Sequence, residues 1–251
     1  MSNYNPFSLE GKTILVTGAS SGIGQATAIE CSKMGAKLVI TGRNAERLQQ
    51  TFRQLEGEGH HQVVAELTND EDVKRLITES PELNGLVLCA GRGMTLPFMF
   101  CTREKFNSIF DVNFFAPVEL LRLCVKNKKL PKQSAVVAVA STGGTISHVA
   151  GNAVYDASKC ALYSMMKSCA KELAPKQIRV NMVSPAMVTT PLVGGFQANV
   201  SQEQIQKDIQ KYPLKRYGEP EEIARAIIYL LSDASSWVTG HALVIDGGVT
   251  I

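Results

Sequence analysis

A short apolar strand followed at once by a glycine-rich turn and a helix is the feature that most constrains the fold of this chain. Residues 12–17 read Lys-Thr-Ile-Leu-Val-Thr, the turn Gly18-Ala-Ser-Ser-Gly22-Ile-Gly24 follows, and a helical pattern then runs to Met34. Gly18 suits a sharp turn, Gly22 lets the backbone approach a phosphate closely, and Gly24 permits close packing of the helix on the strand. The amides at the start of such a helix favour an anion.

Strands and helices alternate along the rest of the chain, without a linker or internal repeat. This rhythm predicts one α/β domain over residues 1–251, a doubly wound (Rossmann-type) fold with a parallel seven-stranded sheet, helices on both faces, and ligands at the carboxyl ends of the strands. The expected strands are 12–17, 37–41, 62–66, 85–89, 134–140, 178–183 and 242–246, and the expected helices are 22–34, 44–56, 70–79, a long helix within 103–127, 152–174, 201–211 and 220–232.

The end of the second strand indicates which dinucleotide such a site would take. Residues just past it should meet the adenosine ribose, and they are Gly42, Arg43 and Asn44. An acidic residue there would accept from the 2′-hydroxyl of NAD, whereas a 2′-phosphate is held by Arg and repelled by a carboxylate. With no acid at Thr41 or Gly42, Arg43 favours NADP(H) over NAD(H). The alternative is an exposed arginine at a helix start.

Tyr155 and Lys159 are candidates for proton transfer. They stand four residues apart at the start of an expected helix, so they share a face. A tyrosine that works as an acid/base at neutral pH needs its pKa lowered by roughly three units, about 4 kcal/mol. A positive charge about 4 Å away supplies on the order of that energy at an effective dielectric near 20. The alternative is a half-exposed aromatic beside a solvated charge.

Composition excludes several other classes of function. The net charge of +3 is small, and basic residues are scattered among acidic ones, so we expect no nucleic-acid or membrane partner. The six cysteines form no CxxC pair and there are four histidines, so we expect free thiols and no metal site. The N-terminus lacks the pattern of a signal peptide and no apolar run reaches membrane-spanning length, which predicts a cytoplasmic protein.

From about Gly11 to Gly248 the chain resembles the short-chain dehydrogenase/reductase family, and in particular its 3-oxoacyl-carrier-protein reductases. The matching motifs occur in the family's order along the whole chain. They are Thr17-Gly18-Ala-Ser-Ser-Gly22-Ile-Gly24, Asn113, Ser141, Tyr155-x-x-x-Lys159, Ile178-Arg-Val-Asn181, Val238-Thr-Gly240 and Asp246-Gly-Gly248.

The resemblance implies a role for each matching residue. Tyr155 would be the acid/base and Ser141 the donor to the substrate oxygen. Lys159 would bind the nicotinamide ribose and lower the tyrosine pKa, and Asn113 would hold a water of the proton relay. The implied cofactor contacts are Gly18, Ser20, Ser21, Gly22 and Ile23 at the phosphates, Glu66 and Leu67 at the adenine, Val188 and Thr190 at the carboxamide, and Ala90 and Gly91 at the end of the fourth strand, besides Arg43, Tyr155 and Lys159.

The implied activity is hydride transfer between NADP(H) and the carbonyl or secondary alcohol carbon of a small molecule. A sugar or polyol dehydrogenase of the same family fits equally well. A non-catalytic dinucleotide sensor on the same fold is a rival from another class, although it would not need Tyr155, Lys159, Ser141 and Asn113.

Three departures from the family pattern leave questions open. The family's Asn-Asn-Ala-Gly is Leu88-Cys89-Ala90-Gly91 here, so the support of that strand end must differ. Its Pro-Gly after the sixth strand is Pro185-Ala186, which adds a methyl near the nicotinamide. The serine usually stands thirteen residues before the tyrosine, which is Thr142 here; alignment of the preceding strand selects Ser141 instead, and we prefer Ser141.

Two further expectations concern the substrate and assembly. Residues 187–217 should form a substrate lid that bends near Gly194 and Gly195, with Met94, Phe98, Leu192 and Phe196 as candidates for lining an apolar pocket. The helices at 103–127 and 152–174 carry apolar residues on more than one face, which favours a homodimer or homotetramer over a monomer. The apolar residues in question are Phe106, Ile109, Phe110, Phe114, Phe115, Leu162, Met165 and Met166.

Overall fold

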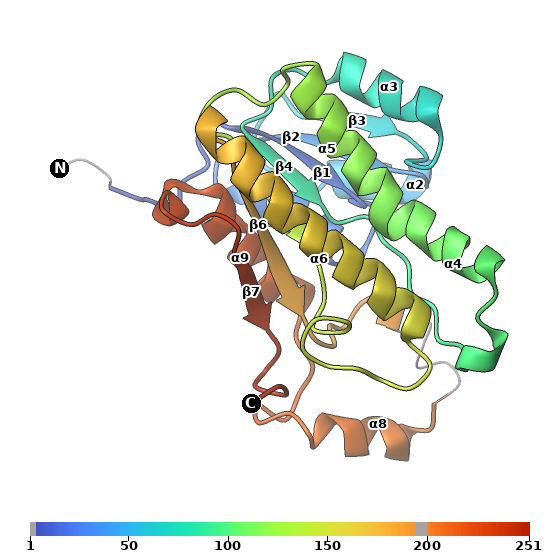
Figure 1. The fold of residues 1–251 in the computed structure, drawn as a ribbon. Coiled ribbons are helices and arrows are strands. Elements are labelled where there is room, and N and C mark those ends of the chain that lie inside the picture. Colours follow the sequence, from blue (N-terminus) through green and yellow to red (C-terminus); the bar gives the residue numbers. More distant parts are fainter. Residues whose placement is uncertain (1–3, 194–199) are drawn as a thin grey trace.

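The predicted doubly wound sheet is confirmed. A computed structural model of the protein describes residues 4–193 and 200–251. Seven parallel strands lie in the order β3-β2-β1-β4-β5-β6-β7, and the order reverses its direction between β1 and β4 (Figure 1). At such a point the connections diverge to opposite faces and leave a crevice at the carboxyl ends. The strands are β1 Thr13–Thr17, β2 Lys37–Gly42, β3 His61–Val64, β4 Gly85–Leu88, β5 Ala135–Val139, β6 Arg179–Pro185 and β7 Ala242–Ile245.

Helices cover both faces of the sheet, and each face has its own apolar core. On one face α1 (Gly22–Lys33), α2 (Ala45–Phe52) and α9 (Pro220–Leu231) pack on the sheet. On the other face lie α3 (Asp70–Glu79), α5 (Ala116–Lys126) and α6 (Ala153–Leu173), with α4 (Arg103–Phe110) alongside α6. The central strands β4 and β5 are buried on both sides, which explains their continuous apolar sequence. Helix α8 (Gln202–Ile209) lies beyond the carboxyl end of β6 (Figure 1).

The long helix expected within 103–127 is interrupted. Between α4 and α5 the chain widens into a π-helical turn over Asp111–Phe115, which contains Asn113. Helix α2 also ends at Phe52 rather than at residue 56, because tighter turns replace its pattern after Arg53. Short 3₁₀ helices at Phe98–Phe100, Ala174–Lys176 and Asp233–Ser235 were not anticipated. Gly194, Gly195 and Phe196 lie outside the described residues.

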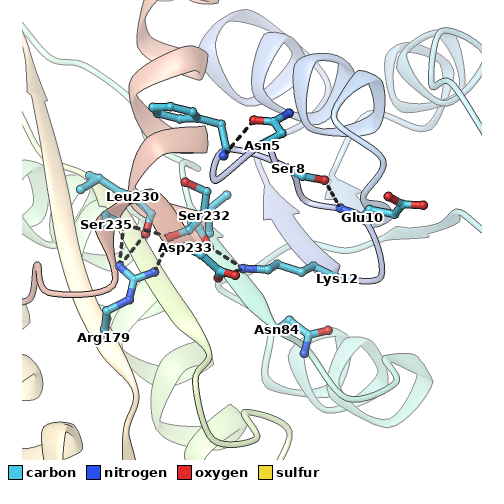
Figure 2. A network of polar contacts seen from close by, with 12 residues as sticks. Asn5, Ser8, Glu10, Lys12, Asn84, Arg179, Leu230, Ser232, Asp233 and Ser235 are labelled. Atoms are coloured by element: carbon cyan, nitrogen blue, oxygen red, sulfur yellow. Dashed lines mark hydrogen bonds and ion pairs between the residues drawn. The ribbon is translucent and has the colours of Figure 1, made fainter. Parts of the chain in front are cut away.

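A polar network fixes the end of α9 to the sheet. Arg179, at the start of β6, donates to the carbonyls of Leu230 (2.8 Å) and Ser232 (3.1 Å) and to the Ser235 hydroxyl (2.8 Å), as Figure 2 shows. The last carbonyls of a helix lack intrahelical partners, so one guanidinium satisfies several at once. Next to it Lys12 forms an ion pair with Asp233 at 2.7 Å. Helix α9 is thereby held against β1 and β6.

Within residues 4–193 and 200–251, no helix combines the length and apolarity that crossing a membrane requires. The same residues contain no group of three or more His, Cys, Asp or Glu side chains that could hold a metal ion. All six cysteines are free thiols; Cys31 and Cys124 are buried, whereas Cys160 is exposed.

Candidate active site

A cavity of about 880 Å³ follows the carboxyl edge of the sheet and joins the predicted site residues. Every residue predicted to bind cofactor or carry catalysis lines it, with the single exception of Asn113. Sequence reasoning had named neither Arg47, Thr68, Arg92 nor Asp156, which also line it. Arg92 and Thr68 each stand four residues past the last residue of a strand, β4 and β3 respectively, and this position is the signal that could have identified them.

The glycine-rich turn has the geometry of an anion cradle. Gly18 has φ +67°, and a Cβ there would lie 2.9 Å from the Ala90 Cα. A Cβ on Gly24 would lie 2.4 Å from the Gly18 carbonyl oxygen, so only glycine allows α1 to pack this closely. Ser21 at the N-cap of α1 makes no capping hydrogen bond with its side chain. The first-turn amides are therefore left for another acceptor, which fits the pyrophosphate of a dinucleotide.

A threonine provides the support that the missing asparagines at Leu88-Cys89 would give. The Thr17 hydroxyl accepts from the backbone N–H groups of Cys89 (2.9 Å) and Ala90 (3.1 Å) and donates to the Val87 carbonyl (3.1 Å). Because Thr17 is the last residue of β1, this clamp joins the glycine-rich turn to the end of β4. The strand ends on either side of the crevice are thus held together.

At the end of the cavity formed by β2 and β3, Arg43 lies beside Glu66. Their side chains form an ion pair of 3.7 Å, with Arg43 70% and Glu66 42% exposed. Arg47 lines the same end, and Asn44 caps α2 by accepting from the backbone N–H of Arg47 at 2.9 Å. The sequence directly after β2 contains no acidic residue. The pairing of Arg43 with Glu66, which follows β3, was therefore not predicted.

Tyr155 and Ser141 meet in the middle of the cavity. Tyr155 comes from the first turn of α6 and Ser141 from the loop after β5, and interaction with the Ser141 hydroxyl works to lower the pKa of Tyr155. The backbone N–H of Gly143 also donates to the Ser141 oxygen, at 3.0 Å. Thr142, in contrast, is buried and directs its hydroxyl to the Pro185 carbonyl, 3.4 Å away. Of the two candidate hydroxyls, Ser141 is therefore the one that contacts Tyr155.

The expected effect of Lys159 on the tyrosine pKa is not met in this structure. Burial raises the pKa of Tyr155, and the Ser141 hydrogen bond opposes that rise only in part. The Lys159 ammonium is 5.9 Å from the centre of the Tyr155 ring and donates to the Val139 carbonyl at 2.8 Å. Its own pKa is lowered to about 8 by burial. The lysine thus lies beside the tyrosine ring, bonded to β5.

Asn113 lies behind the cavity wall instead of on it. Its fully buried amide accepts from the N–H of Arg92 and donates to the carbonyl of Arg92, both at 2.9 Å, and also donates to the Ser158 hydroxyl at 3.1 Å. Both amide hydrogens are therefore used. A Cβ on Gly91 would lie 3.3 Å from the Asn113 oxygen and 3.5 Å from the Lys159 nitrogen. Asn113 therefore supports the cavity wall from behind Gly91.

The loop after β6 completes the site. Ala186, Val188 and Thr190 line the cavity, and the Ala186 N–H donates to Ile245 of β7 at 3.2 Å. Of the candidates for an apolar pocket, Leu192 lines this cavity and Phe98 lines a second one beside it; Met94 lines neither. The methyl of Ala186 lies on the wall, as expected for a departure from glycine.

Comparison with known proteins agrees with this geometry. A family model described as "Enoyl-(Acyl carrier protein) reductase" matches residues 18–250. The chain is 34% identical over 241 residues to the 3-oxoacyl-[acyl-carrier-protein] reductase FabG of Rickettsia felis, covering 96% of this chain and 98% of that protein.

Two solved structures from Brucella melitensis superpose on nearly the whole chain. One is a short-chain dehydrogenase/reductase titled glucose/ribitol dehydrogenase, with a TM-score of 0.91 and 30% identity, covering 98% of this chain and all of that one. The other is a 3-ketoacyl-(acyl-carrier-protein) reductase complexed with NADH, with a TM-score of 0.86 and 30% identity, covering 97% and 100%. The chain belongs to the short-chain dehydrogenase/reductase family and is an NAD(P)-dependent oxidoreductase acting on carbonyl or alcohol groups.

Proposed function

We propose that the protein is an NADP(H)-dependent reductase of carbonyl compounds, similar to 3-oxoacyl-carrier-protein reductases. The observation that carries the proposal is that Tyr155 and Ser141, the glycine-rich turn at Gly18 and the cation Arg43 all line one cavity. This arrangement offers an anion cradle for phosphates, a cation for the ribose end and a proton donor, the groups that one extended dinucleotide and its substrate need.

Each side chain of the site has a separate role in the proposed carbonyl reduction. A bound nicotinamide supplies the hydride for the carbonyl carbon. Ser141 holds the carbonyl oxygen with its hydroxyl, and Tyr155 donates its phenolic proton to that oxygen as negative charge develops there. Lys159 binds the ribose hydroxyls and favours the phenolate once the proton has left. The water predicted for Asn113 has to bind at a group other than its side-chain amide hydrogens, which are already used.

The lid segment brings apolar side chains to the cavity. Met187, Leu192 and Val193 of the lid segment face it, together with Val149 from the loop before α6. We propose that residues 187–217 act as the lid and that the group beside the carbonyl is apolar, as in an acyl chain. A sugar or polyol would need a hydrogen-bond partner for each hydroxyl; these four side chains offer none, so such a substrate would have to use polar residues elsewhere on the cavity wall, such as Thr95 or Asn152.

The test is a panel of carbonyl substrates with NADPH, followed by the loss of NADPH absorbance. It should contain 3-oxoacyl thioesters of increasing chain length, simple ketones and keto sugars. The highest kcat/KM is expected for a 3-oxoacyl thioester. A preference for a keto sugar would replace the proposed substrate class with that of the sugar dehydrogenases, and turnover of none of these compounds would favour the dinucleotide sensor.

Ser141→Ala should lower kcat/KM about tenfold to a hundredfold, whereas Thr142→Val should change it less than about threefold. The difference is expected because Ser141 lines the cavity and interacts with Tyr155, whereas the Thr142 hydroxyl is directed to the Pro185 carbonyl. Steady-state kinetics with NADPH on both variants decides this. A larger loss for Thr142→Val would move the substrate-oxygen contact to Thr142.

We also propose that two or more copies assemble through the outer faces of α5 and α6, in the cytoplasm. Ile109, Leu162 and Met166 are core residues, so they do not support assembly. Phe115 (56%), at the end of the π-helical turn before α5, and Met165 (36%), on α6, remain exposed. Exposed apolar side chains that lie on neighbouring elements suit a partner surface.

Light scattering at micromolar protein should give at least the dimer mass for the wild type. Phe115→Glu combined with Met165→Glu should lower that mass, since each places a charge in the interface. Tyr4→Glu, which changes an exposed aromatic residue outside these helices, is the control. A monomer mass for the wild type would refute the assembly.

A further inference from the structure

The pair of Arg43 and Glu66 lies at the end of the cavity where a nucleotide's adenosine ribose would bind. It arises from the register of two neighbouring parallel strands, in which Gly42 of β2 is level with Val64 of β3. Arg43 follows the first and Glu66 comes two residues after the second, so both side chains project at the same edge of the sheet. Arg43 Nη1 and Glu66 Oε2 are 3.7 Å apart.

The Glu66 carboxylate is held in place independently of Arg43. Its other oxygen, Oε1, accepts from the Thr68 hydroxyl at 3.2 Å and from the Thr68 N–H at 3.4 Å. The backbone N–H of Glu66 donates to Asp72 of α3 at 2.8 Å, and Asp72 is in turn paired with Arg75 at 2.8 Å. A negative charge is therefore fixed beside Arg43 whether or not the arginine stays with it.

We propose that Glu66 competes with the 2′-phosphate of NADP(H) for Arg43, and so limits the preference for NADP(H) that Arg43 creates. This inference rests on the proposed function. NAD(H) has a 2′-hydroxyl and leaves the ion pair intact. A 2′-phosphate has to draw Arg43 away from Glu66, and it is then a near-dianion close to a fixed carboxylate. Glu66 thus sets cofactor choice through the arginine, in addition to the adenine contact expected of it.

The experiment measures equilibrium binding of NADP⁺ and NAD⁺ to the whole protein by isothermal titration calorimetry, so it needs no substrate. Glu66→Gln keeps the shape of the side chain and removes its charge. The variant should raise the ratio of NADP⁺ to NAD⁺ affinity about three- to tenfold, the range expected when a partly exposed charge is released from one pair and ceases to repel a phosphate. Glu71→Gln is the matched control, because Glu71 is also paired, with Lys74, but does not line the cavity.

A double-mutant cycle with Arg43→Ala separates competition from simple contact. If Glu66 acts through the arginine, Glu66→Gln should change the affinity ratio less in the Arg43→Ala background, where only the direct repulsion between carboxylate and phosphate remains, than in the wild-type background. An undiminished effect there, or an equal change for both nucleotides in the wild-type background, would overturn the inference while leaving the proposed function intact. Failure of the wild type to bind either nucleotide would overturn the proposed function itself, and this inference with it.

Discussion

Tyr155→Phe should leave the protein folded and able to bind NADPH while kcat/KM falls by at least about a hundredfold, the lower end of what general acid catalysis contributes. The substitution removes only the phenolic hydroxyl of Tyr155, which interacts with Ser141. Since burial raises the pKa of this hydroxyl, it is protonated at neutral pH and is ready to donate in the direction of carbonyl reduction. The rate with the best substrate of the panel, together with NADPH binding by calorimetry, checks both halves of this expectation.

Tyr163→Phe is the matched control for that variant. Tyr163 lies on the same helix two turns later, packs against the core and does not line the cavity. The same loss of one hydroxyl should therefore change kcat/KM less than about twofold. If Tyr155→Phe kept more than about a tenth of the wild-type rate, the proton would have to come from another group, with Ser141 the next candidate.

The fold was predictable because local patterns and tertiary packing agree along most of the chain. Helix α3 begins and ends where its sequence indicates, since Asn69 caps it by accepting from the N–H groups of Glu71 and Asp72. The π-helical turn at Asp111–Phe115 was not predictable in the same way. Its widening accompanies contacts of the Asn113 side chain with Arg92 and Ser158, which are far away in sequence.

The candidate site, like the fold, was predictable only in part. Residues that sequence motifs identify, such as the glycine-rich turn and Tyr155 with Lys159, do come together on one cavity. What the motifs cannot give is the conformation of each side chain relative to its neighbours. The predicted lowering of the Tyr155 pKa was wrong, because it required a positive charge about 4 Å from the phenol. In the structure burial dominates and raises this pKa, and the Lys159 ammonium donates to the Val139 carbonyl. Predicting the Arg43–Glu66 pair would likewise have required the order and register of β2 and β3.

Arg43→Ala should lower kcat/KM for NADPH relative to NADH by about thirtyfold. Charge-assisted hydrogen bonds from a guanidinium to a phosphate contribute roughly 1.5–3 kcal/mol each. Arg43 is 70% exposed and has to leave Glu66, so we expect a net preference of about 2 kcal/mol, which corresponds to about thirtyfold. Measuring both cofactors on the wild type and the variant decides this. A wild type that already prefers NADH, or an equal loss for both cofactors, would contradict it.

Gly42→Asp combined with Arg43→Ala should invert the preference toward NADH, because the new carboxylate repels a 2′-phosphate and accepts from a 2′-hydroxyl. The substitution also has a steric effect that has to be separated from its charge. A Cβ on Gly42 would lie 3.1 Å from the Ser20 hydroxyl oxygen and 3.2 Å from the Ser20 Cβ, so Ser20, itself a predicted phosphate contact, has to shift slightly. Gly42→Asn introduces the same bulk without the charge and is therefore the control. If Asn and Asp at this position shift the ratio of kcat/KM values equally, crowding of Ser20 accounts for the change. If only Asp inverts it, the charge next to the ribose determines which cofactor this enzyme uses.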